Sequence, residues 1–325
     1  MSGQVLVTGA TGLVGGHVVR QLLEQGRSVR VLVRAPDRLV PELRARVRVV
    51  QGDLAHGPLL APALAGVDTV LHLAACARAW CRDPAEFEAV NIRAVDHLLA
   101  AAAAARVRRV VHVSTVLTLP MLRPAAGTRA ATPYETTKLE GERLVDAWAA
   151  AGHDAVVVHP TRIYGPGPLN DANGVTRLIA LYLDAPVVFR LSDREVQANY
   201  VHAADVAHGI IAAADRGRPG AHYLLGGENR SLRGLLELVG TLSGLRRRVV
   251  AIPRTAALAA AHAALLWGRM GGTAPITPDW MRSWFDDQRV HPSVLAHELG
   301  YRPRPLEQGL RETIAWLRHR LPAAA

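Results

Sequence analysis

The chain has 325 residues, half of them apolar, and a formal net charge of +10 at pH 7. This length and composition fit one large α/β domain with a smaller appended part and do not suggest extensive disorder. The basic residues are spread along the sequence, and the tight cluster at 246–248 has no nucleic-acid-binding motif beside it, so we expect a solvated arginine-rich surface and no nucleic-acid partner.

The sequence contains no recognisable targeting or membrane segment. The chain enters a strand-like run at Gln4 without a charged and apolar leader, which argues against a secretory signal. The most apolar stretch, at 255–267, falls short of the roughly 20 residues that cross a bilayer. We therefore expect a cytoplasmic protein. Cys76 and Cys81 have poor zinc spacing, so we expect free thiols and no metal site.

Strand-like and helix-like segments alternate through the first half, which predicts a parallel sheet with helices on both faces. Near-continuous Val/Leu runs are typical of strands buried on both faces. The predicted elements are strands at 5–8, 29–33, 47–50, 69–72, 109–113 and 155–158, and helices at 13–25 and 84–105 and from before residue 134 to about 151.

After residue 160 the sequence becomes richer in loops. It predicts a loop at 165–168, a helix at 174–184, an extended piece at 199–202, a helix beginning near Asp205 and a strand at 222–225 that returns to the main sheet. Helices and loops follow from residue 231. This part reads as a smaller cap that is interleaved with the sheet domain.

A glycine motif joins the first strand to the first helix. The strand runs into Thr8-Gly9-Ala-Thr-Gly12-Leu-Val-Gly15. Glycines there permit a tight turn and let backbone N–H groups approach a pyrophosphate, and the helix N-terminus adds its positive end. A plain turn is the alternative, but the placement favours a dinucleotide. We therefore expect an α/β fold, a Rossmann-type doubly wound parallel sheet with a smaller interleaved C-terminal substrate-binding cap.

The order of the predicted strands and helices also predicts the domain limits. We assign residues 1–165 to the dinucleotide-binding domain, with 199–228 returning to it, and 166–198 and 229–325 to the cap.

Arg34 stands about where an NAD site usually has an acidic residue, and Arg38 follows it. A guanidinium suits a 2′-phosphate and cannot accept hydrogen bonds from a diol, so NADP(H) is favoured, with NAD(H) as the alternative. Both arginines being plain surface residues is the competing interpretation. Asp53 is predicted either to accept from the adenine amino group or to cap a turn.

Lys138 is the only lysine among 38 basic residues, and it follows Tyr134 by four positions. On a helix, positions i and i+4 share a face, so the phenol and the ammonium point into one cleft. A core tyrosine on an amphipathic helix is the less favoured alternative.

Together these motifs resemble an extended short-chain dehydrogenase/reductase of the NAD-dependent epimerase/dehydratase superfamily. Segments at 223–229 and 298–303 are most similar to the branch of dihydroflavonol reductases, 3β-hydroxysteroid dehydrogenases and hopanoid-associated epimerase-like proteins. The resemblance rests on the motifs Thr8-Gly-x-x-Gly-x-x-Gly15, Gly52-Asp-Leu54, His72-Leu-Ala-Ala75, Ser114-Thr115, Tyr134-x-x-x-Lys138, His159-Pro160-Thr-Arg-Ile-Tyr-Gly-Pro-Gly167 and Tyr200-Val-His-Ala-Ala-Asp205.

The resemblance implies a Thr115–Tyr134–Lys138 triad, with Ser114 facing the cofactor. Lys138 would bind the nicotinamide ribose and, with the charge of the oxidised cofactor, favour a phenolate on Tyr134. Tyr134 would exchange a proton with the carbonyl oxygen, and Thr115 would hydrogen-bond that oxygen. The motifs and the resemblance together place these residues at the cofactor: Gly9, Thr11, Gly12, Leu13, Val14, Gly15, Arg34, Arg38, Asp53, Leu54, Leu73, Ala74, Ala75, Ser114, Tyr134, Lys138, Pro160, Thr161, Arg162 and Ile163.

His159 departs from the family pattern, in which an arginine usually precedes this proline. We expect both His159 and His202 to be hydrogen-bonded structural histidines.

Reduction, epimerisation and dehydration all begin with the same hydride and proton transfer. Val116 and Leu117 stand where 4,6-dehydratases of sugar nucleotides carry Asp-Glu, which disfavours dehydration. The apolar run at 255–267, with Trp280 and Trp284, suits either a lipophilic ligand or an ordinary buried helix. We expect an NADP(H)-dependent oxidoreductase that interconverts a ketone and a secondary alcohol on an apolar small molecule. A nucleotide-sugar epimerase is the alternative, and a homodimer would fit the family.

Overall fold

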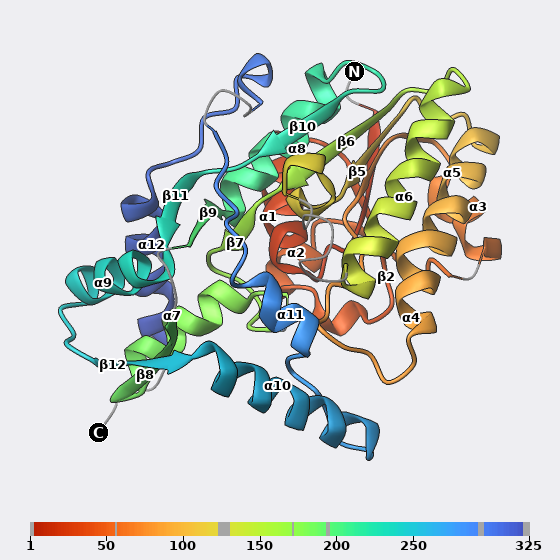
Figure 1. Cartoon of the computed structure of the whole chain (residues 1–325). Coiled ribbons are helices and arrows are strands. Elements are labelled where there is room, and N and C mark those ends of the chain that lie inside the picture. Colours follow the sequence, from red (N-terminus) through yellow and green to blue (C-terminus); the bar gives the residue numbers. More distant parts are fainter. Residues whose placement is uncertain are drawn as a thin grey trace.

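The computed structural model describes residues 3–55, 57–122, 131–170, 172–192, 196–291 and 296–320. At the centre of these residues lies a seven-stranded sheet in the order β10-β6-β5-β4-β1-β2-β3 (Figure 1). Every pair of neighbours in it is parallel, so the predicted doubly wound sheet is confirmed. Its strands are β1 Gln4–Thr8, β2 Val29–Val33, β3 Arg48–Gln51, β4 Val67–His72, β5 Arg109–Val113, β6 Ala155–Pro160 and β10 His222–Leu225.

Helices cover both faces of this sheet. Side chains alternate along each strand, so Val5 and Val7 enter the core with α1 Leu13–Glu24 and α8 Ala203–Arg216, whereas Leu6 enters the opposite core. That second core is closed by α3 Leu60–Leu64, α5 Ala94–Ala104 and α6 Pro133–Ala150. The other helices are α2 Pro41–Arg44, α4 Ala85–Glu88, α7 Gly174–Asp184, α9 Leu232–Ser243, α10 Arg254–Arg269, α11 Pro278–Ser283 and α12 Leu306–Arg320.

Two small sheets lie beside the central one, in the orders β11-β9-β7 and β12-β8. The predicted strand at 222–225 joins the central sheet, but the one at 199–202 pairs with β7 and β11 instead. The domain limits remain a prediction. The strands of the small sheets are β7 Arg162–Tyr164, β8 Val187–Ser192, β9 Gln197–His202, β11 Glu228–Ser231 and β12 Arg248–Pro253.

The single helix predicted at 84–105 is interrupted. A π-helical turn, Ala89–Arg93, separates α4 from α5 and carries the buried Asn91. Its side-chain amide accepts from Cys76 N at 2.8 Å and donates to Cys76 O at 3.2 Å and to Thr137 Oγ1 at 3.0 Å. The wider turn thus ties the segment after β4 to α6, which carries Tyr134 and Lys138.

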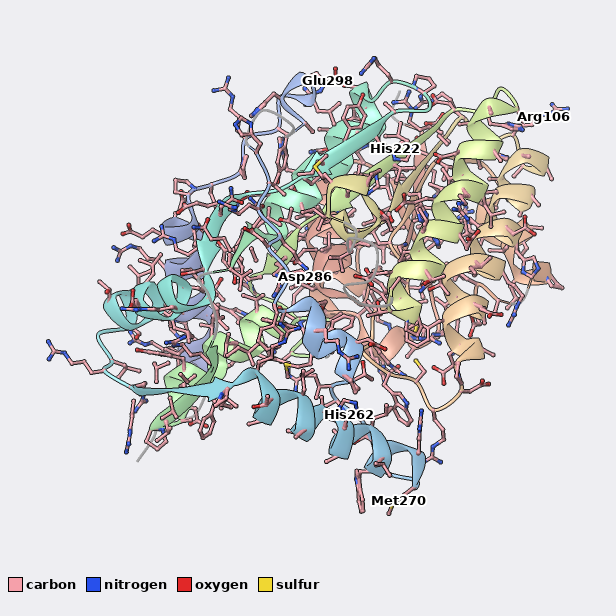
Figure 2. The ribbon with its side chains drawn as sticks, viewed as in Figure 1. Arg106, His222, His262, Met270, Asp286 and Glu298 are labelled. Atoms are coloured by element: carbon pink, nitrogen blue, oxygen red, sulfur yellow. The ribbon has the colours of Figure 1, made fainter. Side chains whose placement is uncertain are left out.

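The apolar run at 255–267 lies within α10. Only Ala257, Ala261 and Gly268 of this helix are buried, and Trp267 is 61% exposed. Met270 lies at the free end of α10, away from the sheet (Figure 2). The buried-helix interpretation is therefore wrong for most of α10, because the run is apolar all round but covers little of the core. Within the described residues no helix has the length and apolarity to span a membrane.

We predict that Gly141→Ala destabilises the protein, because α6 approaches the π-helical turn too closely for a side chain. A Cβ at Gly141 would lie 2.5 Å from the carbonyl oxygen of Asn91. Overpacking of this kind costs roughly 1–3 kcal/mol, and we expect a lower Tm in scanning calorimetry. Gly16→Ala is the matched control, since a Cβ there meets nothing within 4 Å and the helix should gain stability. An unchanged Tm for Gly141→Ala would contradict the packing argument.

Candidate active site

A cavity of about 910 Å³ opens along the carboxyl ends of the central strands. Ligands of doubly wound sheets bind in this place, because the loops that follow the parallel strands meet there. Every residue that the sequence assigned to the triad or the cofactor lines this one cavity. The structure therefore brings the predicted residues together, while their individual roles remain predictions.

The loop after β1 fits a pyrophosphate. Gly9 has φ +71°, and a Cβ at Gly15 would lie 2.1 Å from the Gly9 carbonyl oxygen, so both positions require glycine. Helix α1 begins at Leu13, its N-cap residue Gly12 provides no side-chain cap, and its first turn has no acidic residue. Its first N–H groups, which have no partner within the helix, can therefore bind an anion. By contrast, α6 is closed by a capping box between Thr132 and Glu135.

Thr8 joins this loop to the loop after β4. Its Oγ1 accepts from Leu73 N and Ala74 N, both at 3.2 Å, and lies 2.8 Å from His72 Nδ1. The predicted ribose side of the cofactor site is thus fixed directly to the glycine loop.

Arg34 and Asp53 line the end of the cavity where the adenosine part of the cofactor is predicted to bind. The Arg34 side chain is 71% exposed, and its guanidinium lies 3.9 Å from Asp53 Oδ2. The other Asp53 oxygen accepts from Ala55 N at 3.0 Å, as the turn-capping alternative predicts. Arg38 lines the same end, so two guanidinium groups are available to an anionic ligand there.

Lys138 is held in the interior. Its side chain is 1% exposed, and its Nζ donates to Val113 O at 2.8 Å and lies 3.2 Å from His112 Nε2. Burial lowers the pKa of Lys138 to about 8, and the negative charge of Glu142 opposes that effect. His112 was not anticipated from the sequence, and only its position on β5 brings it under the lysine.

Tyr134 is a neutral phenol in the chain alone. Burial raises the pKa of Tyr134 to about 12, and a hydrogen bond with the Thr115 side chain is the main opposing influence. The acidification expected from Lys138 therefore does not outweigh burial in the protein by itself. A neutral phenol beside Thr115 is suited to donating a proton to a carbonyl oxygen.

Ser114 lines the cavity and also has a partner behind the cavity wall. Its hydroxyl donates to Glu142 Oε1, because that buried carboxylate lies directly behind it. Glu142 was not predicted, although its position four residues after Lys138 on the same helix was a usable signal.

The two noted histidines are hydrogen-bonded. His159 contacts Thr115 O at 3.1 Å through Nδ1 and His222 Nδ1 at 2.9 Å through Nε2. His202 accepts from Ala204 N at 3.3 Å and caps α8.

The cap supplies the remaining wall. Trp280 lies with its ring centroid 6.2 Å from that of Tyr134. The Arg162 guanidinium lies 4.2 Å over the Trp284 ring and donates to Gln288 Oε1 at 3.0 Å, so its side chain reaches towards the cap. None of the described residues that line this cavity belongs to α10, so the apolar run contributes nothing to its wall.

The sequence model of the NAD dependent epimerase/dehydratase family matches residues 5–226. The chain belongs to this family. It is similar to a 4-hydroxy-2-methyl-3-oxo-4-farnesyl-3,4-dihydroquinoline-1-oxide ketoreductase of Stigmatella aurantiaca, with 33% identity over 80% of this chain and 79% of the relative. It is 30% identical to a 2-alkyl-3-oxoalkanoate reductase of Stenotrophomonas maltophilia over 95% of this chain and 97% of the relative.

Among solved structures, the dTDP-glucose 4,6-dehydratase DesIV of Streptomyces venezuelae with NAD bound superposes with a TM-score of 0.75 and 25% identity, covering 97% of each chain. Like other members of the epimerase/dehydratase family, the protein is therefore an NAD(P)-dependent enzyme of the short-chain dehydrogenase/reductase type.

We predict that Lys138→Met stabilises the protein at pH 7 and that this gain shrinks as the pH rises. The folded state holds the lysine proton more weakly than the unfolded state, since burial lowers the pKa of Lys138 to about 8 from 10.5. Below pH 8 the buried charge therefore lowers the free energy of unfolding of the wild type by on the order of 3 kcal/mol. This loss disappears between about pH 8 and 10.5. Tm values of both proteins across this range measure the effect.

An independent check uses the lysine itself. Since Lys138 is the only lysine, protein labelled with 15N-lysine has a single side-chain signal. We expect that signal to titrate near pH 8, and a midpoint above pH 10 would contradict the burial argument.

Proposed function

We propose that this enzyme of the epimerase/dehydratase family reduces a ketone on an apolar small molecule to a secondary alcohol, with NADP(H) as the cofactor. The observation that carries this proposal is the single cavity in which Thr115, Tyr134 and Lys138 lie between a phosphate-binding glycine loop and an aromatic wall from the cap. Such a cavity places a carbonyl group next to both a hydride donor and a proton donor.

The NADP(H) preference is argued from charge at the adenosine end. Arg34 and Arg38 line the cavity there, and Arg34 is largely exposed to an incoming ligand. A guanidinium binds phosphate through paired, charge-assisted hydrogen bonds, whereas a ribose diol prefers a carboxylate. Asp53 neutralises Arg34 only weakly, at 3.9 Å and in contact with solvent.

The chemistry divides among the three triad side chains. The bound cofactor supplies the hydride. Tyr134 donates a proton to the carbonyl oxygen, and Thr115 hydrogen-bonds both Tyr134 and that oxygen. Lys138 lies four residues along the same face of α6, where its ammonium favours negative charge on the phenol oxygen as the proton leaves.

The apolar substrate is argued from the cap and from the relatives. Trp280 and Trp284 line the cavity, and the Trp280 ring centroid lies 6.2 Å from that of Tyr134. The names of the two relatives describe reduction of a farnesylated dihydroquinoline oxide and of a 2-alkyl-3-oxoalkanoate, both of which carry long apolar groups. An epimerase would need a cation for the pyrophosphate of its sugar nucleotide, and Arg162, on the cavity wall, is already stacked on Trp284 and hydrogen-bonded to Gln288.

The deciding experiment measures hydride turnover. Purified protein is mixed with NADPH or NADH and either a panel of 3-oxoalkanoates and terpenoid or steroid ketones or a panel of UDP- and dTDP-sugars. Stoichiometric loss of NADPH with a ketone supports the proposal. Interconversion of a nucleotide sugar without net loss of cofactor would replace it with the epimerase.

We predict that Tyr134→Phe lowers kcat for ketone reduction by roughly 10²–10⁴-fold, because the proton donor is removed. The NADPH dissociation constant should stay within a few-fold of wild type. Tyr182→Phe is the matched control, since Tyr182 is buried outside the cavity and its hydroxyl lies 3.4 Å from Leu245 O. A Tyr134→Phe variant with a near-normal rate would remove the tyrosine from the proton-transfer step.

We predict that Arg34→Asp shifts the cofactor preference from NADPH towards NADH. Loss of a charged hydrogen bond costs about 1.5–3 kcal/mol, so kcat/KM for NADPH should fall by roughly 10- to 100-fold while that for NADH changes little. Arg44→Asp is the control for net charge, because Arg44 is exposed on α2 and does not line the cavity. An unchanged NADPH/NADH ratio would exclude Arg34 from the phosphate site.

A further inference from the structure

The arginine cluster at 246–248 and the apolar run at 255–267 lie outside the catalytic cavity, and the fold brings them together. The cluster ends in β12, and the apolar run follows directly in α10. Strand β12 pairs with β8, and α10 contacts both strands. Figure 1 shows β8, β12 and α10 along one edge of the molecule. We call residues 187–192 and 246–270 the α10 edge.

The α10 edge exposes large apolar side chains. Leu266, Trp267 and Met270 are 59%, 61% and 73% exposed. Because residues three and four positions apart share one side of a helix, these side chains form a group at the free end of α10, where Figure 2 labels Met270. Phe189 and Val249 are exposed on the two strands. These five are half of the exposed large apolar side chains among the described residues, so such side chains are concentrated on this edge.

Helix α10 has arginines only at its two ends. Arg254 begins the helix and Arg269 ends it, and the exposed positions between them are one threonine, one histidine, one leucine, one tryptophan and four alanines. A helix on the surface of a water-soluble domain ordinarily turns charged and polar residues outward. Helix α10 instead presents apolar side chains outward along its 16 residues, a length of about 24 Å. Its outer side is therefore suited to apolar surroundings.

The charge of the α10 edge is positive throughout. No acidic residue occurs between Glu237 and Asp279, whereas five arginines do, so this segment carries half of the formal net charge of +10. Arg247 points inward, where it donates to the carbonyl oxygens of Tyr182 and Leu183. The other four arginines are exposed, and no carboxylate of the described residues forms an ion pair with them. They are Arg246, Arg248, Arg254 and Arg269.

We propose that the α10 edge is a docking surface for a lipid bilayer that contains anionic lipids. Leu266, Trp267 and Met270 enter the boundary between headgroups and acyl chains, and the four exposed arginines bind lipid phosphates. A helix with an apolar side and flanking cations lies in the plane of such a boundary, because acyl chains take up the apolar side and acidic headgroups attract the cations. Tryptophan suits this depth, since its ring is apolar and its N–H is polar.

A bilayer fits these observations better than a second copy of the chain or a nucleic acid. In a symmetric dimer the same surface of each subunit meets its counterpart, so two arginine-bearing edges without carboxylates would face each other. A nucleic acid would bind the arginines but leave the apolar group at the end of α10 in water. An anionic bilayer takes up both the charge and the apolar surface.

The α10 edge also lies close to the catalytic cavity. Helix α10 contacts α11, which supplies Trp280 to the cavity wall. A second cavity of about 810 Å³ lies between the two helices, with Leu265 of α10 and Pro278 of α11 in its lining. Docking would therefore hold the substrate cavity beside a bilayer in which apolar ketones dissolve. This consequence rests on the proposed reductase function, whereas the docking itself does not.

Vesicle sedimentation tests the docking without any substrate. The full chain is mixed with sucrose-loaded vesicles of phosphatidylcholine, either alone or with phosphatidylglycerol, at low and high salt. We expect the partition coefficient to be at least about tenfold higher for the anionic vesicles and to fall in high salt, because the arginines contribute through screened electrostatic attraction. Equal partitioning into neutral and anionic vesicles, or none into either, would overturn the proposal.

Two sets of variants assign the binding to the α10 edge. The triple variant Leu266→Ser/Trp267→Ser/Met270→Ser should lower the partition coefficient at least about tenfold, and Met121→Ser, at a position that is also 61% exposed, is its control. Arg246→Glu/Arg248→Glu should lower it by a similar factor. Its control, Arg44→Glu/Arg48→Glu, changes the net charge equally at exposed positions elsewhere. Losses in the controls as large as those in the edge variants would overturn the assignment.

Fluorescence quenching locates the contact. Anionic vesicles that contain phosphatidylcholine with brominated acyl chains should quench the tryptophan emission of the wild type, and most of this quenching should be lost in Trp267→Phe. Quenching that is the same in both proteins would contradict insertion of α10. A duplex DNA that binds the triple variant as tightly as the wild type, with no vesicle binding, would assign the edge to nucleic acid, and self-association that the triple variant abolishes, again without vesicle binding, would assign it to a second copy. If vesicles bind but no ketone is reduced, the docking stands and the proposed reductase function fails.

Discussion

The ammonium group of Lys138 is buried at the carboxyl end of a parallel sheet, and the polar groups around it are arranged to support that charge. Its Nζ donates to Val113 O and contacts His112, whose ring stacks on His72 with centroids 5.3 Å apart. His72 in turn contacts Thr8, which fixes the glycine loop. One layer of side chains from β5, β4 and β1 therefore links α6 to the glycine loop.

In this layer the lysine carries the charge and the two histidines are neutral. Burial and the positive charge of Lys138 lower the pKa of His72 to about 3 and hold that of His112 well below its usual value, so both imidazoles stay neutral. The neutral His112 ring accepts from the ammonium without competing with it for charge. The chain thus keeps a cation in its interior beside uncharged histidines, an arrangement that costs stability and suits catalysis.

The sequence predicts the parts of this structure that depend on local pattern. The central strands read as continuous apolar runs, and Tyr134 and Lys138 come together through helical spacing alone. The missed parts depend on pairing between distant residues. Strand β11 has no apolar residue to mark it, whereas β12 has an apolar run at 249–252 whose residues are not buried. The sequence does not predict the exposure of α10 either, because the pattern of an alanine-rich helix without a polar face does not indicate which side packs against the core.

The contact between His159 and His222 joins residues 63 positions apart, and strand register creates it. In the β6–β10 pair, Val157 is opposite His222 and His159 is opposite Leu224, so the two histidines lie diagonally on one face of the sheet. Predicting the contact requires both strands to be assigned and their register to be known. The sequence predicts the two strands but does not give the register between them.

Helix α6 carries a row of titratable side chains that reaches from the cavity to solvent. Tyr134, Lys138, Glu142 and Asp146 follow one another at intervals of four residues. Because an α-helix has 3.6 residues per turn, each interval rotates the side chain by about 40° around the axis. Over three intervals the line of side chains advances by about 18 Å and turns through about 120°, from Tyr134 on the cavity wall to the half-exposed carboxylate of Asp146. A single helix therefore presents Tyr134 and Lys138 to the cavity and the Asp146 carboxylate to water, with no break in regular structure between them.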